Sequence, residues 1–444
     1  MAQNSLHHPS FSELIRVSAR IGFLSFGGPA GQIALMHREL VDERRWVEEE
    51  EYLQALNLCH LLPGPEAQQL ATSIGWKLHG WRGGLVAGLL FVAPGALVML
   101  GLSILYAFAA DLEWFAALLL GIKAAVLAIV TQALLRIAGR ALKTPLQKGL
   151  ALAAFVALFL FNAPFPVVVL AALAIGAIVG ARRPDILGLK VSSHFAESPA
   201  NAWRSSAMAV LAWGSVWAAP MAAVLVFLGR EHVLWDIGVF FSQLAVVTFG
   251  GAYAVLAYMA QEAVNGFGWL SAGEMADGLG LAETTPGPLI MVTQFVGYLA
   301  AFRSPEPFTP ILAGVLGAAL TTWVTFAPCF MWIFAFAPWM DRLQRTPALK
   351  GGLAGVTAAV VGVIANLALW FALHVLFERV TEVSAGPLRL QVPEGGTLDL
   401  NAAIISAVAF LMIFTFKRGL ILTLGVSAAM GLALTSLTWL GFAS

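Results

Sequence analysis

Charged side chains are scarce in this sequence. Asp, Glu, Lys and Arg together make up 11% of its 444 residues, whereas hydrophobic residues make up 59%. A soluble domain carries about 25% charged residues, so this composition excludes an ordinary soluble enzyme or binding domain. The mean hydropathy of +0.82 and the long apolar stretches predict an all-α polytopic membrane protein.

Cysteine is also rare, since only Cys59 and Cys329 are present. Two unrelated cysteines give neither a disulfide framework nor a thiolate metal site, and we expect both to be small core residues. Asp is never clustered, and His60 has no second ligand at metal spacing, so we predict no metal and no other cofactor. The 25 basic and 25 acidic residues balance, which argues against a nucleic-acid partner. The polar N-terminus lacks a small-residue cleavage site, so the first hydrophobic segment should stay in the mature protein.

One stretch of the chain, from Phe26 to Pro65, occurs twice. It opens with Phe26-Gly27-Gly28-Pro29 and closes with Pro63-Gly64-Pro65, and Phe249-Gly250-Gly251 and Pro286-Gly287-Pro288 follow at an offset of 223 residues. Without a gap, 14 of 40 aligned positions are identical, where shared composition alone gives roughly three or four. The chain is therefore predicted to contain two copies of one unit, each interrupted at the same two places.

The apolar segments divide into two series. A membrane-spanning helix needs about 20 mostly apolar residues. We expect six helical segments in each copy and one linking transmembrane helix between them. The segments of the first copy are residues 11–37, 50–79, 83–108, 113–138, 147–162 and 164–181. The linking helix covers residues 204–229, and the second copy has residues 235–262, 272–302, 308–338, 347–377, 401–416 and 418–441.

Basic residues in the short loops predict how the copies are oriented. They follow even-numbered segments in the first copy (Arg140 to Lys148, and Arg182 to Lys190) and odd-numbered segments in the second (Arg342 to Lys350, and Lys417-Arg418). Because basic loops stay in the cytoplasm, the copies should have inverted topology. We expect a first repeat at 1–182, a polar loop plus linking helix at 183–233, and an inverted repeat at 234–444. Whether the Pro-Gly-Pro segments span the membrane or re-enter stays open, and with it the side of the N-terminus.

The glycine and proline breaks are the predicted substrate site. Pro cannot continue a helix but suits the first turn of a new one, and Gly admits positive φ. New helix N-termini bind anions through free N–H groups, and inverted-repeat transporters place such broken helices at one midplane site. Single kinks are common packing features in membrane helices, but recurrence in both copies favours function. The predicted backbone contacts are Gly27, Gly28, Pro63, Gly64, Gly250, Gly251, Pro286 and Gly287.

Charged residues within the segments extend this site. Lys123 lies deep in the fourth segment, where a lysine costs at least about 2.5–3.5 kcal/mol without a partner or polar cavity. Two interpretations stay open: it attracts an anionic substrate, or it snorkels or pairs with a carboxylate such as Glu113. Arg20 lies one turn before Leu24, and could supply a second positive charge at the first break.

Polar residues beside the Pro-Gly-Pro triplets have candidate roles as well. Glu66 and Glu283 are either helix caps or the protonatable groups of a proton-coupled cycle. The Gln68 amide can donate to an oxyanion without adding charge, as can Gln69 and Gln294. Nearby Thr hydroxyls can do so too, although they often bond their own helix backbone.

At these residues the chain resembles the chromate ion transporter family, in its long two-domain form. The resemblance rests on Phe23-Leu24-Ser25-Phe26-Gly27-Gly28-Pro29, Arg44-Arg45-Trp46, the run Leu58 to Ala71, Thr248 to Tyr253 and Pro286-Gly287-Pro288. Departures are His60, where we expect glutamine, and Glu283, where a polar amide is more usual.

The resemblance implies export of chromate across the bacterial cytoplasmic (inner) membrane, and so chromate resistance. Sulfate is a structural mimic, and the driving force is the membrane potential or a proton gradient, the latter by antiport. Our hypothesis is a secondary transporter for a tetrahedral dianion in the lipid bilayer, not an enzyme. A sulfate or other oxyanion transporter of the same fold is the alternative, and a membrane-embedded lipid-acting enzyme is disfavoured because Asp-rich metal motifs are missing. The oligomeric state, a homodimer included, stays open.

Overall fold

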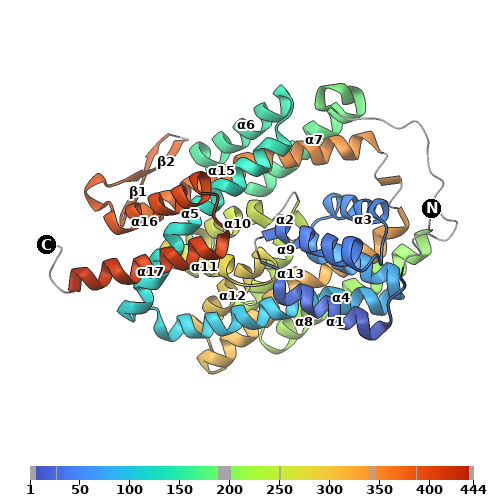
Figure 1. Ribbon diagram of the computed structural model, residues 1–444, viewed down its shortest axis with the longest axis horizontal. Helices are drawn as coiled ribbons and strands as arrows, with labels where there is room; N and C mark the ends of the chain where they lie inside the picture. Colours follow the sequence, from blue (N-terminus) through green and yellow to red (C-terminus); the bar gives the residue numbers. More distant parts are fainter. Residues whose placement is uncertain are drawn as a thin grey trace. The chain divides into compact units, whose positions relative to one another are not determined.

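The computed structural model describes residues 7–26, 28–188, 202–249, 252–339, 342–343, 346–386 and 388–439 (Figure 1). Nearly all regular structure among them is α-helical. The first copy and the linker contain α1 (Phe11–Leu24), α2 (Gly28–His37), α3 (Glu49–Leu61), α4 (Glu66–Ala109), α5 (Glu113–Ala141), α6 (Pro145–Phe161), α7 (Phe165–Arg182) and α8 (Ala202–Phe227). The second copy contains α9 (Val233–Val247), α10 (Ala252–Gln261), α11 (Ala272–Thr284), α12 (Val292–Arg303), α13 (Pro310–Phe336), α15 (Pro347–Leu376), α16 (Leu400–Phe410) and α17 (Leu420–Trp439).

Six helical stretches are long and apolar enough to cross a membrane, among the described residues. They are Glu66–Ala109, Glu113–Ala141, Phe165–Arg182, Ala202–Phe227, Pro310–Trp339 and Pro347–Leu376. The helices α6, α9, α12, α16 and α17 are apolar but shorter. The all-α polytopic membrane class predicted from the sequence is therefore confirmed.

Short elements complete the chain. Three π-helical turns are η1 (Arg38–Glu43), η3 (Glu262–Gly266) and η7 (Leu411–Thr415), and the 3₁₀ turns are η2 (Pro184–Leu187), η4 (Leu289–Met291), η5 (Ala337–Trp339) and η6 (Gly395–Thr397). The strands β1 (Val380–Ala385) and β2 (Leu388–Pro393) form an antiparallel hairpin, between the predicted segments 347–377 and 401–416.

The helices assemble into two compact units. Unit 1 contains Met1–Gly101, Val191–Val255 and Thr285–Lys350, and unit 2 contains Leu102–Lys190, Leu256–Thr284 and Gly351–Ser444. Each unit thus takes helices from both copies of the repeat. The packing units differ from the repeats at 1–182 and 234–444, whose boundaries stay a prediction.

In unit 1 the first Pro-Gly-Pro triplet is the tip of a helical hairpin. Its arms are α3 and the first part of α4, which ends where His79 and Gly80 leave helical geometry. At the open end Lys77 forms an ion pair with Glu51, and at the tip His60 Nδ1 lies 3.3 Å from Glu66 Oε1. The 13-residue α3 is about 20 Å long at 1.5 Å per residue, too short to span a bilayer. Because Glu51 and Lys77 meet at its open end, residues 50–79 form a hairpin and not one continuous helix.

The first break is also the tip of a hairpin, formed by α1 and α2. The open end is closed by a hydrogen bond from His7 N to Arg45 O of 3.1 Å, and His79 Nε2 lies 3.0 Å from Pro9 O. Arms of 14 and 10 residues are again too short to span. The expectation that residues 11–37 form one membrane span is therefore wrong, because the chain turns back at Ser25-Phe26 and both hairpins open at the same end.

Glycine lets the longer helices of unit 1 pack at close range. At Gly80, where φ is +61°, α4 folds back so that Gly75 faces Gly83, and a Cβ on Gly75 would lie 2.4 Å from the Gly83 carbonyl oxygen. The helices α12 and α13 repeat this arrangement, since a Cβ on Gly317 would lie 2.3 Å from Gly297 O. Small residues that let backbones approach are the usual packing device of membrane helices.

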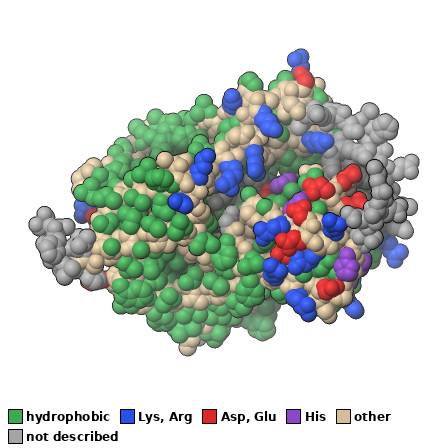
Figure 2. Space-filling model, viewed as in Figure 1, with side chains coloured by type: hydrophobic (Ala, Val, Ile, Leu, Met, Phe, Trp, Pro, Cys, Tyr) green, Lys and Arg blue, Asp and Glu red, His purple; other side chains and the backbone are tan. Residues whose placement is uncertain are grey.

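Unit 2 is built around α5, which packs on α11, α16 and α17. A Cβ on Gly121 would lie 2.1 Å from Ser427 O on α17, and Ser406 Oγ of α16 donates to Ala124 O at 3.1 Å. On the face drawn in Figure 2, hydrophobic side chains cover α16 and α17 in this unit, whereas in unit 1 charged side chains gather over the ends of α1 to α3. Wide apolar surfaces are expected on helices that face lipid.

Candidate functional site

The described break residues all lie in unit 1. Gly28 begins α2 with φ +70°, and Gly64 and Gly287 have φ +116° and +88°. Left-handed backbone of this kind favours glycine, which explains the residue at each tip. Pro63 and Pro286 immediately precede Gly64 and Gly287. The predicted contacts Gly27, Gly250 and Gly251 lie outside the described residues.

The tips from the two copies are joined by a reciprocal pair of backbone hydrogen bonds. Gly64 N donates to Thr248 O at 2.8 Å, and Gly287 N donates to Ser25 O at 2.8 Å. Equivalent positions of the two copies are 223 residues apart, so Gly64 corresponds to Gly287 and Ser25 to Thr248. The two hydrogen bonds are therefore the same contact with the copies exchanged. The prediction that the N–H groups of Gly64 and Gly287 are free for a substrate is corrected here, because each donates to the opposite copy.

We call the pair of contacts Gly64–Thr248 and Gly287–Ser25 the tip crossing. Three buried glutamines donate hydrogen bonds to backbone carbonyl groups around this crossing. Gln32 Nε2 donates to Gly287 O at 2.6 Å, Gln69 Nε2 to Pro63 O at 2.6 Å and Gln294 Nε2 to Ala96 O at 2.9 Å. Gln69 and Gln294 were candidates for binding an oxyanion, and one N–H of each amide donates to a backbone carbonyl instead. Gln68 is different: it is fully buried, and among the described residues its Nε2 contacts only Thr72 Oγ1, at 3.5 Å.

First-turn N–H groups supply further donors. The first turn of a helix leaves its N–H groups without intrahelical acceptors, and here these belong to Glu66 and Ala67 at the start of α4 and to Leu289 and Ile290 after Pro288. Ala67, Leu289 and Ile290 are buried. The two tips joined by these hydrogen bonds are thus each followed by a helix N-terminus, an arrangement suited to an anion.

Hydroxyl groups near the crossing bond their own helices. Ser25 Oγ donates to Ile21 O and Thr248 Oγ1 donates to Leu244 O, each at 2.6 Å. Thr284 and Thr293 donate to carbonyls three residues earlier. These contacts match the ordinary behaviour of Ser and Thr in helices and leave the hydroxyls with a structural role.

The acidic candidates beside the tips are placed differently from each other. Glu66 pairs with His60 across the first tip, which ties the last turn of α3 to the first residue of α4. Glu283 occupies the position equivalent to His60 and is buried in the last turn of α11. Cys59 and Cys329 are buried and free, and Cys329 Sγ lies 2.9 Å from where a Gly64 Cβ would be.

Arg20 has a carboxylate partner. Its Nε lies 3.6 Å from Oε1 of Glu39, a residue that is 1% exposed, and Arg44 Nη1 forms a second ion pair with the same carboxylate. A buried carboxylate is stable only when it is paired. Arg20 therefore has a structural role, because its ion pair with Glu39 joins α1 to η1.

Lys123 also has a partner, and it is in unit 2. Its Nζ lies 3.4 Å from Oδ1 of Asp277 on α11, and Tyr106 Oη donates to Asp277 Oδ2 at 3.0 Å. A carboxylate partner was one of the open interpretations, but it is Asp277, not the exposed Glu113. Sequence reasoning missed Asp277, although a lone acid in a short apolar arm is itself a signal of function.

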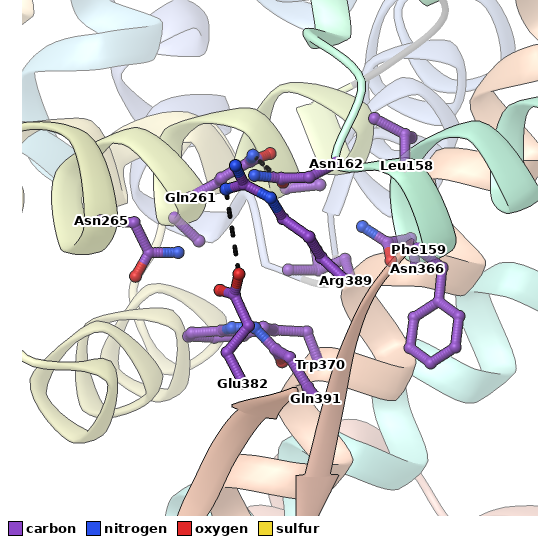
Figure 3. Close-up of a pocket in the computed structure, with 13 residues that line it drawn as sticks. Leu158, Phe159, Asn162, Gln261, Asn265, Asn366, Trp370, Glu382, Arg389 and Gln391 are labelled. Carbon is purple, nitrogen blue, oxygen red and sulfur yellow. Dashed lines mark hydrogen bonds and ion pairs between the residues drawn. The ribbon is translucent and has the colours of Figure 1, made fainter. Parts of the chain in front are cut away.

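A second polar site of unit 2 lies between the β-hairpin and the helix ends (Figure 3). Arg389 and Glu382 point from the strands into the pocket and lie 3.8 Å apart, and Gln261 Nε2 donates to Asn162 Oδ1. Five amide and six apolar side chains make up the rest of the lining, and the ion pair adds no net charge. The pocket therefore does not attract an anion by charge.

Fold and site together define a polytopic α-helical membrane protein whose helices are interrupted at glycine-proline tips. Comparison with known sequences gives the family. The model of the family described as "Chromate transporter" matches residues 12–178 and 235–432. The chain belongs to this family, which makes it a multi-pass membrane protein and supports chromate transport as its function class.

Individual relatives agree over most of the chain. A "Chromate transport protein" of Pseudomonas aeruginosa is 34% identical over 387 residues, covering 85% of this chain and 84% of the relative. A "Probable chromate transport protein" of Synechococcus elongatus is 29% identical over 81% and 84% of the two chains. A "Chromate transport protein" of Cupriavidus metallidurans is 28% identical over 94% and 92%. No solved structure matches the chain.

Proposed function

We propose that this protein exports chromate from the cytoplasm across the inner membrane and so confers chromate resistance. The observation that carries the proposal is the reciprocal crossing of Gly64 with Thr248 and of Gly287 with Ser25. Interrupted helices that meet from two copies form the binding sites of inverted-repeat transporters. Family membership supports chromate as the substrate.

Hairpin geometry and loop charge support inverted copies. In the first copy the hairpin ends and following turns (38–48 and 77–83) carry Arg38, Arg44, Arg45, Lys77 and Arg82, whereas those of the second (229–232, 261–271 and 302–309) carry only Arg230 and Arg303. Basic residues favour the cytoplasmic side. The turns that flank the breaks of the first copy thus lie in the cytoplasm, and those of the second copy lie outside.

Counting spans gives the same orientation. The remaining spans are the second part of α4, then α5, α6, α7, α8, α13, α15, α16 and α17. With the N-terminus in the cytoplasm, the basic loops at 140–148, 182–183, 342–350 and 417–418 all fall inside. Because α1–α2 re-enters as well as α3–α4, the N-terminus stays cytoplasmic. The β-hairpin and the C-terminus then face outward.

The proposed anion site is the tip crossing of unit 1. The donors are the first-turn N–H groups after Pro65 and Pro288 and the buried amide of Gln68, with Gly28, Gly64 and Gly287 allowing the backbone to approach. Within unit 2, Lys123 is the positive charge that we expect to attract the anion. Arg20 serves α1 packing in this proposal, since Glu39 neutralises it.

Electrostatics favours export. Moving one charge through 100 mV is worth about 2.3 kcal/mol, so a dianion gains about 4.6 kcal/mol when it leaves a cell that is negative inside by 100 mV. An exporter of chromate therefore needs no further energy source, whereas an importer of the same anion would have to overcome this term.

Flux in inside-out vesicles tests the proposal. Vesicles containing the protein should accumulate labelled chromate when the lumen is made positive, and vesicles without the protein should not. Equal or faster accumulation of labelled sulfate would favour the alternative, a general oxyanion transporter. No potential-driven uptake of either anion would overturn the proposal.

A further inference from the structure

The Lys123–Asp277 pair is one of the few charged groups within the helices of unit 2. The Lys123 and Asp277 side chains are 21% and 13% exposed, and Tyr106, which donates to Asp277 Oδ2, is 3% exposed. Asp277 Oδ1, the oxygen that faces Lys123, accepts no hydrogen bond from the described residues. The pair is therefore held by charge without an optimal hydrogen bond, and it can separate.

Packing around the pair fixes the helices that carry it. On α11, Gly280 lies three residues after Asp277, on the same helix face. A Cβ on Gly280 would lie 3.0 Å from Ile122 Cγ2 and 3.7 Å from Lys123 N, so the backbones of α11 and α5 are close. Among the described residues, the other charged group that acts on Asp277 is Glu274 on its own helix, whose carboxylate accepts from Ser271 N at 2.8 Å.

The pair exists in one copy only, and its helix leads to a tip. The repeat equivalent of Asp277 is Gln54, a neutral residue. The helix α11 ends at Thr284, directly before Thr285 and Pro286. Asp277 therefore lies on the helix that directly precedes the second Pro-Gly-Pro triplet in the chain.

We propose that Asp277 carries a proton that moves together with the anion. With no anion bound, the Asp277 carboxylate neutralises Lys123. When an oxyanion takes the place of the carboxylate beside Lys123, Asp277 takes up one proton, because an unpaired carboxylate at a buried site is costly. One dianion and one proton then cross in the same direction, with a net charge of −1. The inference rests on the proposed anion transport.

This stoichiometry remains compatible with export. A net charge of −1 still leaves a cell that is negative inside, driven by the membrane potential. A proton antiport would instead require that proton binding and anion binding exclude each other. Here the Asp277 carboxylate competes with the anion for Lys123, so binding of the anion favours protonation of Asp277.

Reconstituted protein in liposomes tests the inference. Chromate-loaded liposomes exchange internal for labelled external chromate, and a trapped pH dye reports protons during net flow. Wild type should move protons with chromate, and its net flow should fall about tenfold per pH unit above its midpoint, as one titrating group requires. Asp277→Asn should still exchange chromate, with less than about a twofold change over the same range and no proton movement. The exposed Glu113→Gln variant should behave as wild type.

A second variant covers the case in which Asp277→Asn does not fold. Tyr106→Phe keeps the ion pair and removes one hydrogen bond to the carboxylate, so the pH midpoint of net flow should move upward. Exchange by wild type without proton movement, proton movement opposite to chromate, or unchanged pH profiles in both variants would each overturn the inference alone. Absence of any exchange by wild type would overturn the proposed function as well.

Discussion

The N–H of Gly64 donates to the carbonyl oxygen of Thr248 at 2.8 Å, which joins a tip of the first copy to a helix end of the second. Gly287 and Ser25 make the same contact with the copies exchanged. Each such bond contributes about 0.5–1.5 kcal/mol net, so separating both costs about 1–3 kcal/mol. A bound dianion can supply this, which makes the crossing a place where the protein can open.

Substitution of the tip glycines should abolish transport. In Gly64→Ala a left-handed backbone costs about 1–2 kcal/mol, and the new Cβ would lie 2.9 Å from Cys329 Sγ and from Gln69 Nε2. Cells expressing the variant should lose chromate resistance at unchanged membrane abundance. Gly101→Ala is the matched control, because nothing lies within 4 Å of its Cβ position, and it should keep resistance. Full resistance in Gly64→Ala would show that the tip geometry is dispensable.

Removing the amide of Gln32 should destabilise the crossing. Gln32 is 1% exposed and donates to Gly287 O at 2.6 Å, so Gln32→Leu leaves a buried carbonyl unpaired at a cost of about 1–3 kcal/mol. Thermal unfolding of the purified protein in detergent should shift to lower temperature. Gln54→Leu, which removes an exposed hydrogen bond to Glu50, should shift it much less. Equal shifts would contradict the assigned role.

The hairpin formed by α3 and α4 predicts a cross-link. Glu51 and Lys77 form an ion pair at its open end, so cysteines at these two positions should be joined by a short bifunctional thiol reagent. Cysteines at Glu51 and Glu66 are separated by the length of α3, about 20 Å, and should not react. Cys59 and Cys329 are first replaced by Ala. A helix that spanned the membrane from 50 to 79 would give no Glu51–Lys77 product.

Lys123 is expected to be essential for transport. Lys123→Ala removes the positive charge and leaves Asp277 unpaired, so chromate resistance should be lost while membrane abundance is maintained. Lys123→Arg keeps the charge and should retain part of the activity. Resistance at the wild-type level in Lys123→Ala would remove this residue from the transport path.

Much of the fold was predictable because Gly and Pro have local effects. The breaks at Gly28, Gly64 and Gly287 follow from backbone chemistry alone, and the structure has left-handed backbone at each. Re-entry was not predictable from length, since two short arms of a hairpin contain as many apolar residues as one span. Only a contact distant in sequence, such as Lys77 with Glu51, distinguishes them.

The site was less predictable than the fold. Which residue forms an ion pair with Lys123 depends on tertiary packing. The sequence therefore predicted a carboxylate partner for Lys123 but could not identify it as Asp277. The engaged N–H groups of Gly64 and Gly287 likewise depend on the other copy. For the β-hairpin a signal was present, because Leu388, Leu390 and Val392 alternate as in a strand.

The orientation of the two copies is the central claim, and cysteine labelling tests it most directly. Arg82 and Ser304 are exposed and lie in the turns that follow the first and second Pro-Gly-Pro tips. With Cys59 and Cys329 replaced by Ala, a membrane-impermeant maleimide added to intact cells should label Ser304→Cys and not Arg82→Cys, and inside-out vesicles should give the reverse. Labelling of both positions from the same side would contradict inverted copies and the shared site proposed between their tips.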